Sequence, residues 1–184
     1  MKKTFIAVIV GAIIIFAWQS IAWVMLKHHD TAFKQVANQD SVISNLTSIF
    51  KENGQYLVPR ADVNASQKEQ AEMTEKNIGK PWALVTYHKS YKGDMNAALI
   101  RGFLISLVCV WILVWLMGNN PGTFLTVTFK SIGIGLFAFL FVWYNGHNWF
   151  DTPWAVLHGE LIDLVVGWGL CGIWLGWWLN KEKA

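Results

Sequence analysis

The sequence has few charged residues. Asp, Glu, Lys and Arg together make up 15% of its 184 residues, whereas soluble globular domains carry about 25%. Hydrophobic residues account for 54%. This balance excludes an ordinary soluble domain and indicates an integral membrane protein. The net charge of +3 is spread over the termini and one long polar segment, so there is no basic patch for nucleic acid and no nucleic-acid partner is expected.

Cysteine is also scarce. The two cysteines, Cys109 and Cys171, both fall inside apolar runs, and we expect small core side chains rather than a disulfide. No CxxC spacing for zinc or covalently bound haem is present. The sequence also lacks a phosphate-cradling glycine loop and a hydrolase nucleophile elbow. These absences favour a role other than catalysis.

What the sequence does have is four long apolar runs. Each is close to, or longer than, the ~20 residues that a helix needs to cross a bilayer. The runs are Phe5 to Leu26, Met95 to Met117, Phe124 to Tyr144 and Trp154 to Leu179. None alternates in the manner of a strand, so the predicted fold class is an integral membrane all-α helical bundle with four transmembrane helices.

Tryptophan is abundant, and its positions agree with this interpretation. Most of the twelve tryptophans lie near the ends of the runs, where aromatic side chains form a belt at the membrane interface. They are Trp18, Trp23, Trp111, Trp115, Trp143, Trp149, Trp154, Trp174, Trp177 and Trp178.

Short basic flanks orient the predicted helices. Lys2 and Lys3 precede the first run, and Lys181 and Lys183 follow the last, so both termini are expected in the cytoplasm. The expected location is a bacterial inner (cytoplasmic) membrane. The predicted domains are transmembrane helix 1 in residues 1–27, an extracytoplasmic segment in 28–94, transmembrane helices 2–4 in 95–179 and a cytoplasmic tail in 180–184.

The first run has an alternative interpretation. Met1-Lys-Lys, the apolar core and Ser20-Ile-Ala22 resemble the parts of a cleavable signal peptide. The run continues to Leu26 and reaches spanning length, which favours a retained anchor. With either interpretation residues 28–94 lie outside.

The extracytoplasmic segment is predicted to form a small α/β cap. Apolar residues at helical spacing predict a helix over 41–50 with Asp40 as its N-cap. Ser66 and Glu69 fit a capping box that starts a second helix, over 66–77. Residues 55–59 and 82–87 have the composition of short strands.

Two carboxylates stand inside the last apolar run. At ~1.5 Å per residue, Glu160 lies about 9 Å and Asp163 about 13 Å into a helix that starts at Trp154. A charge in the bilayer core costs at least ~2.5 kcal/mol, so these groups are expected to be paired or functional. Arg101 lies at matching depth in the second run and is the expected counter-ion. A structural ion pair is the preferred interpretation, and the alternatives are a proton relay, an ion pathway or a catalytic acid/base role.

Several candidate metal ligands fall on the same predicted outer side. His28 and His29 follow the first run, His147 and Asp151 are expected in the turn before the fourth, and His158 lies early in the fourth. Imidazole and carboxylate groups bind zinc, copper and iron. Their spacing matches no metal signature, so a metal or haem is a candidate cofactor without being the preferred one.

Glycines in the last two runs predict close helix packing. Small residues let helices approach each other, within the bundle or across a dimer. The candidates are Gly133, Gly135, Gly172 and Gly176.

Three stretches of the chain carry a resemblance. They are Phe16-Ala-Trp18-Gln-Ser20-Ile-Ala-Trp23 leading to His28, the Gly54-x-Tyr56-x-x-Pro59 element, and Asp163 to Gly172 around Gly167-Trp168. Together they cover about a third of the chain, and they resemble uncharacterised small multi-pass bacterial membrane proteins. The resemblance implies a retained first membrane helix and carries no activity.

The function expected from the sequence is that of an interaction or accessory subunit of a membrane assembly. Its partners would be the lipid bilayer and either another membrane protein or a second copy of the chain. One alternative is a membrane redox enzyme that binds metal or haem through the histidines. The other is a small proton-coupled transporter that uses Glu160 and Asp163.

Overall fold

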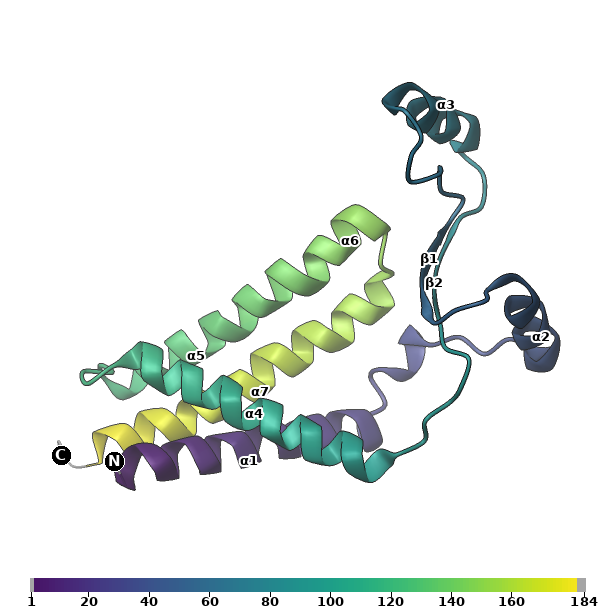
Figure 1. Ribbon diagram of the computed structural model, residues 1–184. Coiled ribbons are helices and arrows are strands. Elements are labelled where there is room, and N and C mark those ends of the chain that lie inside the picture. Colours follow the sequence, from purple (N-terminus) through teal and green to yellow (C-terminus); the bar gives the residue numbers. More distant parts are fainter. Residues whose placement is uncertain (1, 182–184) are drawn as a thin grey trace. The chain divides into compact units, whose positions relative to one another are not determined.

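A computed structural model describes residues 2–181 and is mostly helical (Figure 1). The chain divides into a helical unit, residues 1–34 with 94–184, and a second unit, residues 35–93. Lys183 and the rest of the predicted tail beyond position 181 lie outside the described residues.

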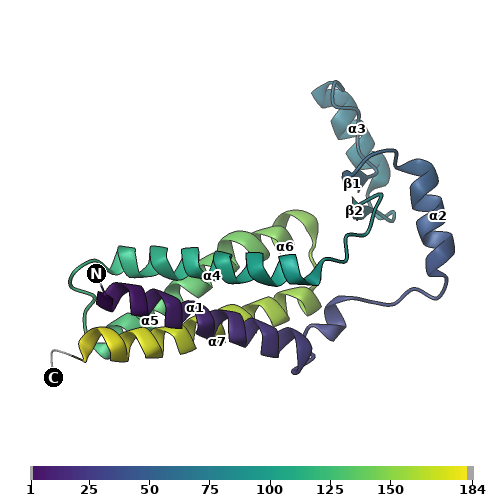
Figure 2. The ribbon, with the colours of Figure 1, turned by 60° about the horizontal axis from the view of Figure 1, so that its bottom comes forward.

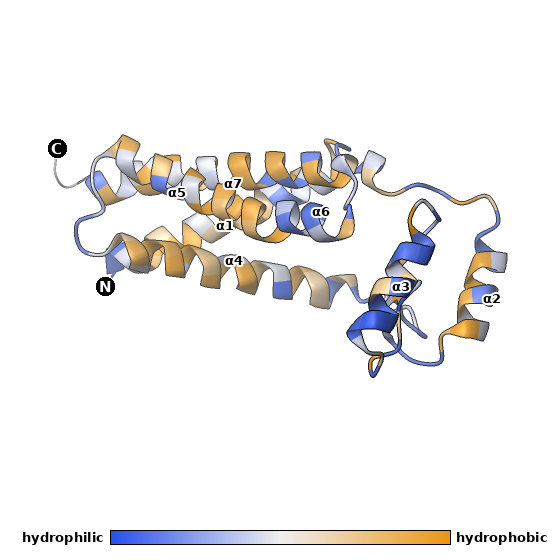
Figure 3. Cartoon of the chain, turned by 90° about the horizontal axis from the view of Figure 1, so that it is seen from above, coloured by the Kyte–Doolittle hydropathy of each residue, from blue (hydrophilic) through white to orange (hydrophobic). Residues whose placement is uncertain are grey.

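Within residues 2–181, four helices are long and apolar enough to cross a membrane. This confirms the predicted helical class and the four apolar helices, whose colouring in Figure 3 is mainly hydrophobic. The helices are α1 (Lys2–Val24), α4 (Met95–Met117), a continuous helix of α5 (Phe124–Ala138), η2 (Phe139–Tyr144) and α6 (Asn145–Phe150), and α7 (Trp154–Asn180).

Helix α1 packs antiparallel to both α4 and α7. Gly11 makes this close approach possible, because a Cβ there would lie 2.8 Å from Val110 of α4 and 3.2 Å from Cys171 of α7. Near the start of α1, the indole Nε1–H of Trp178 donates to the carbonyl of Lys3 over 2.9 Å. Helix α1 therefore begins where α7 ends, and both lie at the same end of the helical unit (Figures 1 and 2).

Glycines also set the contact between α5 and α7. A Cβ at Gly135 would lie 2.6 Å from the carbonyl oxygen of Leu164. A Cβ at Gly172 would meet Ser131, and one at Gly176 would meet the Phe124 backbone, both within 3 Å. Three of the four glycines singled out in the sequence thus lie where the helices touch, whereas Gly133 is exposed and would meet nothing within 4 Å.

The third apolar helix runs further than expected. Its predicted end is Tyr144, but a π-helical turn (η2) continues into α6 and the helix ends at Phe150. Asp151 then adopts a left-handed conformation with φ of 46°, and Pro153 caps the start of α7. The expectation that His147 lies in the turn is therefore wrong: it lies in α6, and the turn itself is residues 151–153.

The second unit contains α2 (Gln39–Ile49), β1 (Gly54–Val58), α3 (Gln67–Asn77) and β2 (Ala83–Tyr87). The two strands pair antiparallel, with Gly54 opposite Tyr87. Within residues 35–93, all of which the structure describes, Phe50 and Tyr87 are the buried residues. The unit therefore has a two-stranded sheet and a small aromatic cluster in place of a large core.

Local capping explains where both helices of this unit begin. The N-cap of α2 is Asn38, which accepts from the Ser41 amide, and not Asp40 as predicted. The predicted capping box of α3 is confirmed: Ser66 and Glu69 exchange hydrogen bonds. Those bonds hold the pKa of the Glu69 carboxyl below its usual range. Helix α3 is largely hydrophilic (Figure 3).

Candidate functional site

The candidate site forms where the chain turns back at the end of α1. Lys27 has φ of 54°, a left-handed conformation uncommon for a residue other than glycine. The reversal places the His29 ring on the Trp23 ring, parallel within 6° and 4.0 Å apart between centroids. The short helix η1 (Asp30–Ala32) then continues the chain. The segment after α1 therefore holds the His29 imidazole against the Trp23 ring.

Gly159 of α7 provides the space for this imidazole. A Cβ at position 159 would lie 2.6 Å from Nδ1 of His29 and 2.7 Å from its Cε1. His29 lies between the Trp23 ring and the α7 backbone, and it is only 4% exposed. Gly159 is not among the glycines that the sequence predicted to lie between helices, because nothing in the sequence shows that a histidine ring lies against it.

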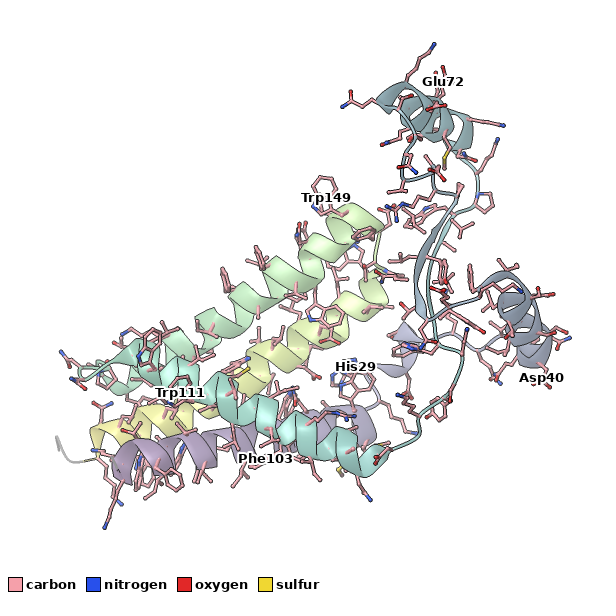
Figure 4. All side chains as sticks on the ribbon, in the orientation of Figure 1. His29, Asp40, Glu72, Phe103, Trp111 and Trp149 are labelled. Atoms are coloured by element: carbon pink, nitrogen blue, oxygen red, sulfur yellow. The ribbon has the colours of Figure 1, made fainter. Side chains whose placement is uncertain are left out.

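Asp163 of α7 joins both histidines. Nε2 of His28 lies 2.8 Å from Oδ1 of Asp163, and Nε2 of His29 lies 2.9 Å from Oδ2. An ionised carboxylate only accepts hydrogen bonds, so each imidazole donates from Nε2 in this arrangement. The Asp163 side chain is 9% exposed and that of His28 is 17% exposed. Figure 4 labels His29 at this end of the bundle.

Glu160 adds a second carboxylate to the cluster. It lies within electrostatic range of His29, Asp163 and His28 and stands three residues before Asp163, on the same face of α7. It is half-buried. The cluster therefore combines the two imidazoles that follow α1 with two carboxylates that lie within about one turn of α7.

Arg101 does not take the role expected from the sequence. It is exposed on α4, and among residues 2–181 the ion-pair partners of Asp163 are His28 and His29. The pairing of Arg101 with Glu160 and Asp163 was predicted from their similar depth along the helices. Similar depth does not determine which faces of the two helices meet. Helix α4 packs on α1, as the contact between Gly102 and Phe16 illustrates, so Arg101 is not directed at the α7 carboxylates.

Three other candidate ligands lie apart from this cluster. Nδ1 of His147 donates to the Thr152 carbonyl over 2.8 Å and so closes the turn between α6 and α7. Asp151 and His158 are exposed. In the part of the chain that the structure describes, His28, His29 and Asp163 are the one set of three ligand-type side chains close enough to share an ion.

These three groups are close enough to share a metal ion. Their ligand atoms all lie within 4.8 Å of one another. Two ligands at ~2.1 Å from one tetrahedral ion are roughly 3.4 Å apart, so the side chains would rearrange around a bound ion. To ligate a metal through Nε2, each imidazole would carry its proton on Nδ1 instead, because imidazole ligates as a neutral group.

The supporting residues match what metal-binding imidazoles require. Ligand histidines need a fixed ring orientation, which neighbouring groups normally supply. For His29 the stacked Trp23 ring and the backbone at Gly159 do so. His28 is the most exposed of the three groups and marks the side from which an ion would enter.

Comparisons with protein-family models, with curated proteins and with solved structures found no match to this chain.

Proposed function

We propose that this chain is a multi-pass membrane protein that binds a divalent transition-metal ion through His28, His29 and Asp163. The observation that carries the proposal is the convergence of both Nε2 atoms on the two oxygens of one almost fully buried carboxylate. Two imidazoles and one carboxylate are the ligand set of many zinc and non-haem iron sites, where further positions stay open for water or substrate.

The donor atoms narrow the choice of metal. Nitrogen and carboxylate oxygen suit borderline ions such as Zn²⁺, Co²⁺ and Fe²⁺, whereas Cu⁺ prefers thiolate and thioether ligands. Cys109 and Cys171 do not belong to the cluster. Haem is a poorer candidate, because both imidazoles are directed at one carboxylate over less than 3 Å and leave no space for a macrocycle between them.

Metal loading tests this proposal. The full chain, purified in detergent and stripped with a chelator, is expected to bind one Zn²⁺ or Co²⁺ ion per molecule, measured by elemental analysis and by the absorption spectrum of Co²⁺. At a free-metal concentration 100 times the Kd, binding should stabilise the fold by ~2.7 kcal/mol. The variants His28→Ala and His29→Ala should neither bind the ion nor be stabilised by adding it.

His158→Ala is the matched control for this experiment, because it removes an exposed histidine from the same end of α7. His158→Ala should bind the same amount of metal as the unmodified chain. Failure of the unmodified chain to bind either metal, or equal loss in His158→Ala and His28→Ala, would contradict the proposal.

The location that we propose is a bacterial inner membrane, with both termini in the cytoplasm and residues 28–94 outside. Basic residues at the shared end of α1 and α7 support this orientation. The hydrogen bond between Trp178 and Lys3 supports only the proposal that both termini lie on the same side. The metal cluster, near the opposite end of both helices, would then face the outside.

Cysteine labelling in intact cells tests this topology, against a background in which Cys109 and Cys171 are replaced by alanine. With an impermeant maleimide, Ser90→Cys should react before permeabilisation and Asn119→Cys, between α4 and α5, only after it. The reverse pattern would contradict the proposed orientation while leaving the metal site untouched.

The other functions expected from the sequence stay predictions. An accessory subunit that also binds metal is compatible with this proposal. A proton-coupled transporter would use the same Asp163, and its distinguishing feature would be flux that continues without metal.

A further inference from the structure

We infer that Glu160 strengthens divalent-cation binding at this site, because it supplies the second negative charge of the cluster. The inference rests on the proposed metal site at His28, His29 and Asp163 and goes beyond it, since Glu160 is not among the three groups that already lie together. Two features of the structure carry it: the position of Glu160 on α7 and the charge balance of the cluster.

The first feature is the position of Glu160 on α7, close to the metal-binding groups in sequence and on the same side of the helix as Asp163. Glu160 follows Gly159, against which His29 packs, and it precedes Asp163 by three residues. It lies within electrostatic range of both histidines and Asp163.

The charge balance gives Glu160 its role. Neutral imidazoles with one carboxylate would leave a bound M²⁺ with a net charge of +1 in a mostly buried site, and an uncompensated charge away from water is costly. The second carboxylate makes the occupied site neutral. In the metal-free chain the same carboxylate is destabilising, because it adds a second negative charge near Asp163, whose ion-pair partners among residues 2–181 are His28 and His29.

This double role has a measurable signature. A residue kept for packing stabilises the empty protein, whereas Glu160 is expected to stabilise only the metal-bound form. Glu160→Gln keeps the shape of the side chain and removes its charge. We expect Glu160→Gln to weaken Co²⁺ and Zn²⁺ binding by roughly 10- to 100-fold, and the chelator-treated variant to melt at the same temperature as the unmodified chain or a higher one.

Asp151→Asn is the control. It removes one carboxylate from the same end of the helical unit, at an exposed residue outside the cluster. Its φ of 46° is tolerated by asparagine. Metal affinity is measured by competition with a chromogenic chelator, and thermal unfolding is measured in detergent with and without Co²⁺. Asp151→Asn should leave metal affinity within about twofold, because screening by water weakens exposed charges.

The outcomes separate the two proposals. If the unmodified chain binds no Co²⁺ or Zn²⁺, the metal site itself is wrong. If the unmodified chain binds metal and Glu160→Gln binds it equally well, the site stands and the role of Glu160 is wrong. If chelator-treated Glu160→Gln melts at a lower temperature with unchanged metal affinity, Glu160 is a packing residue and the inference is overturned. Weaker binding with an undiminished melting temperature supports it.

Discussion

Replacing Asp163 by asparagine is expected to abolish metal binding while leaving the folded state almost as stable as before. Asparagine keeps the shape of the side chain but loses the charge, and its amide nitrogen has no lone pair to offer to an ion or to a histidine Nε2–H. Loss of a supporting group alone costs 10- to 100-fold in metal affinity, so loss of the bridging carboxylate should cost at least roughly 100-fold.

The small effect on stability follows from two opposing terms. The hydrogen bonds that His28 and His29 donate to a charged acceptor contribute about 1.5–3 kcal/mol each, and asparagine can keep one of them. Against this loss, the uncharged amide avoids the cost of keeping a carboxylate in a mostly buried position, which is on the order of a few kcal/mol. The two terms nearly cancel, and Asp163→Asn should unfold in detergent close to the temperature of the metal-free unmodified chain.

This variant also distinguishes a metal site from a structural charge cluster. Metal content is measured by elemental analysis, and folding is measured by gel-filtration profile and thermal unfolding. Arg101→Gln is a suitable control, because Arg101 is exposed and is no ion-pair partner of Asp163. A failure of Asp163→Asn to assemble, with the metal content of the unmodified chain already zero, would mean that the cluster only holds α7 to the end of α1.

Gly135→Ala is expected to destabilise the helical unit, whereas Gly133→Ala, two residues earlier on the same helix, should stabilise it slightly. The new methyl group at position 135 would lie 2.6 Å from the Leu164 carbonyl oxygen and 2.7 Å from the Trp168 ring. Backbone cannot move aside as a flexible side chain can, so α5 and α7 must separate. Overpacking of this kind costs about 1–3 kcal/mol.

At Gly133 the same substitution meets nothing within 4 Å. Alanine is favoured over glycine in a helix interior by up to about 1 kcal/mol, so only the helix propensity changes. Thermal unfolding of the two variants in detergent, side by side with the unmodified chain, should give shifts of opposite sign. Shifts of the same sign and size would show that α5 and α7 do not pack through Gly135.

The site itself could be predicted from the sequence only in part. The chemistry of His28, His29, Glu160 and Asp163 is visible in the residue types, since carboxylates inside an apolar run demand an explanation. Their grouping is not visible. It depends on a left-handed Lys27, which has no sequence signal comparable to a glycine, and on a glycine at 159 whose role appears only when the His29 ring lies against it.

What the sequence alone determined is the set of four apolar helices and most of their ends. Hydropathy and length govern these features, and both are local properties: α4 begins and ends where the apolar run does, and α7 differs from its run by a single residue. Local capping was visible as well at Ser66 and Glu69.

Only the tertiary structure decided which faces of the helices meet. All four helices are apolar nearly all round, so their sequences do not mark a buried stripe, and the contacts follow from where small residues let backbones approach. This is why α4 lies against α1 with Arg101 exposed, and why Asp163 is paired with His28 and His29 instead. The depth of a residue in a membrane follows from its position along one helix. Which residue it pairs with depends on how two helices are rotated and packed against each other.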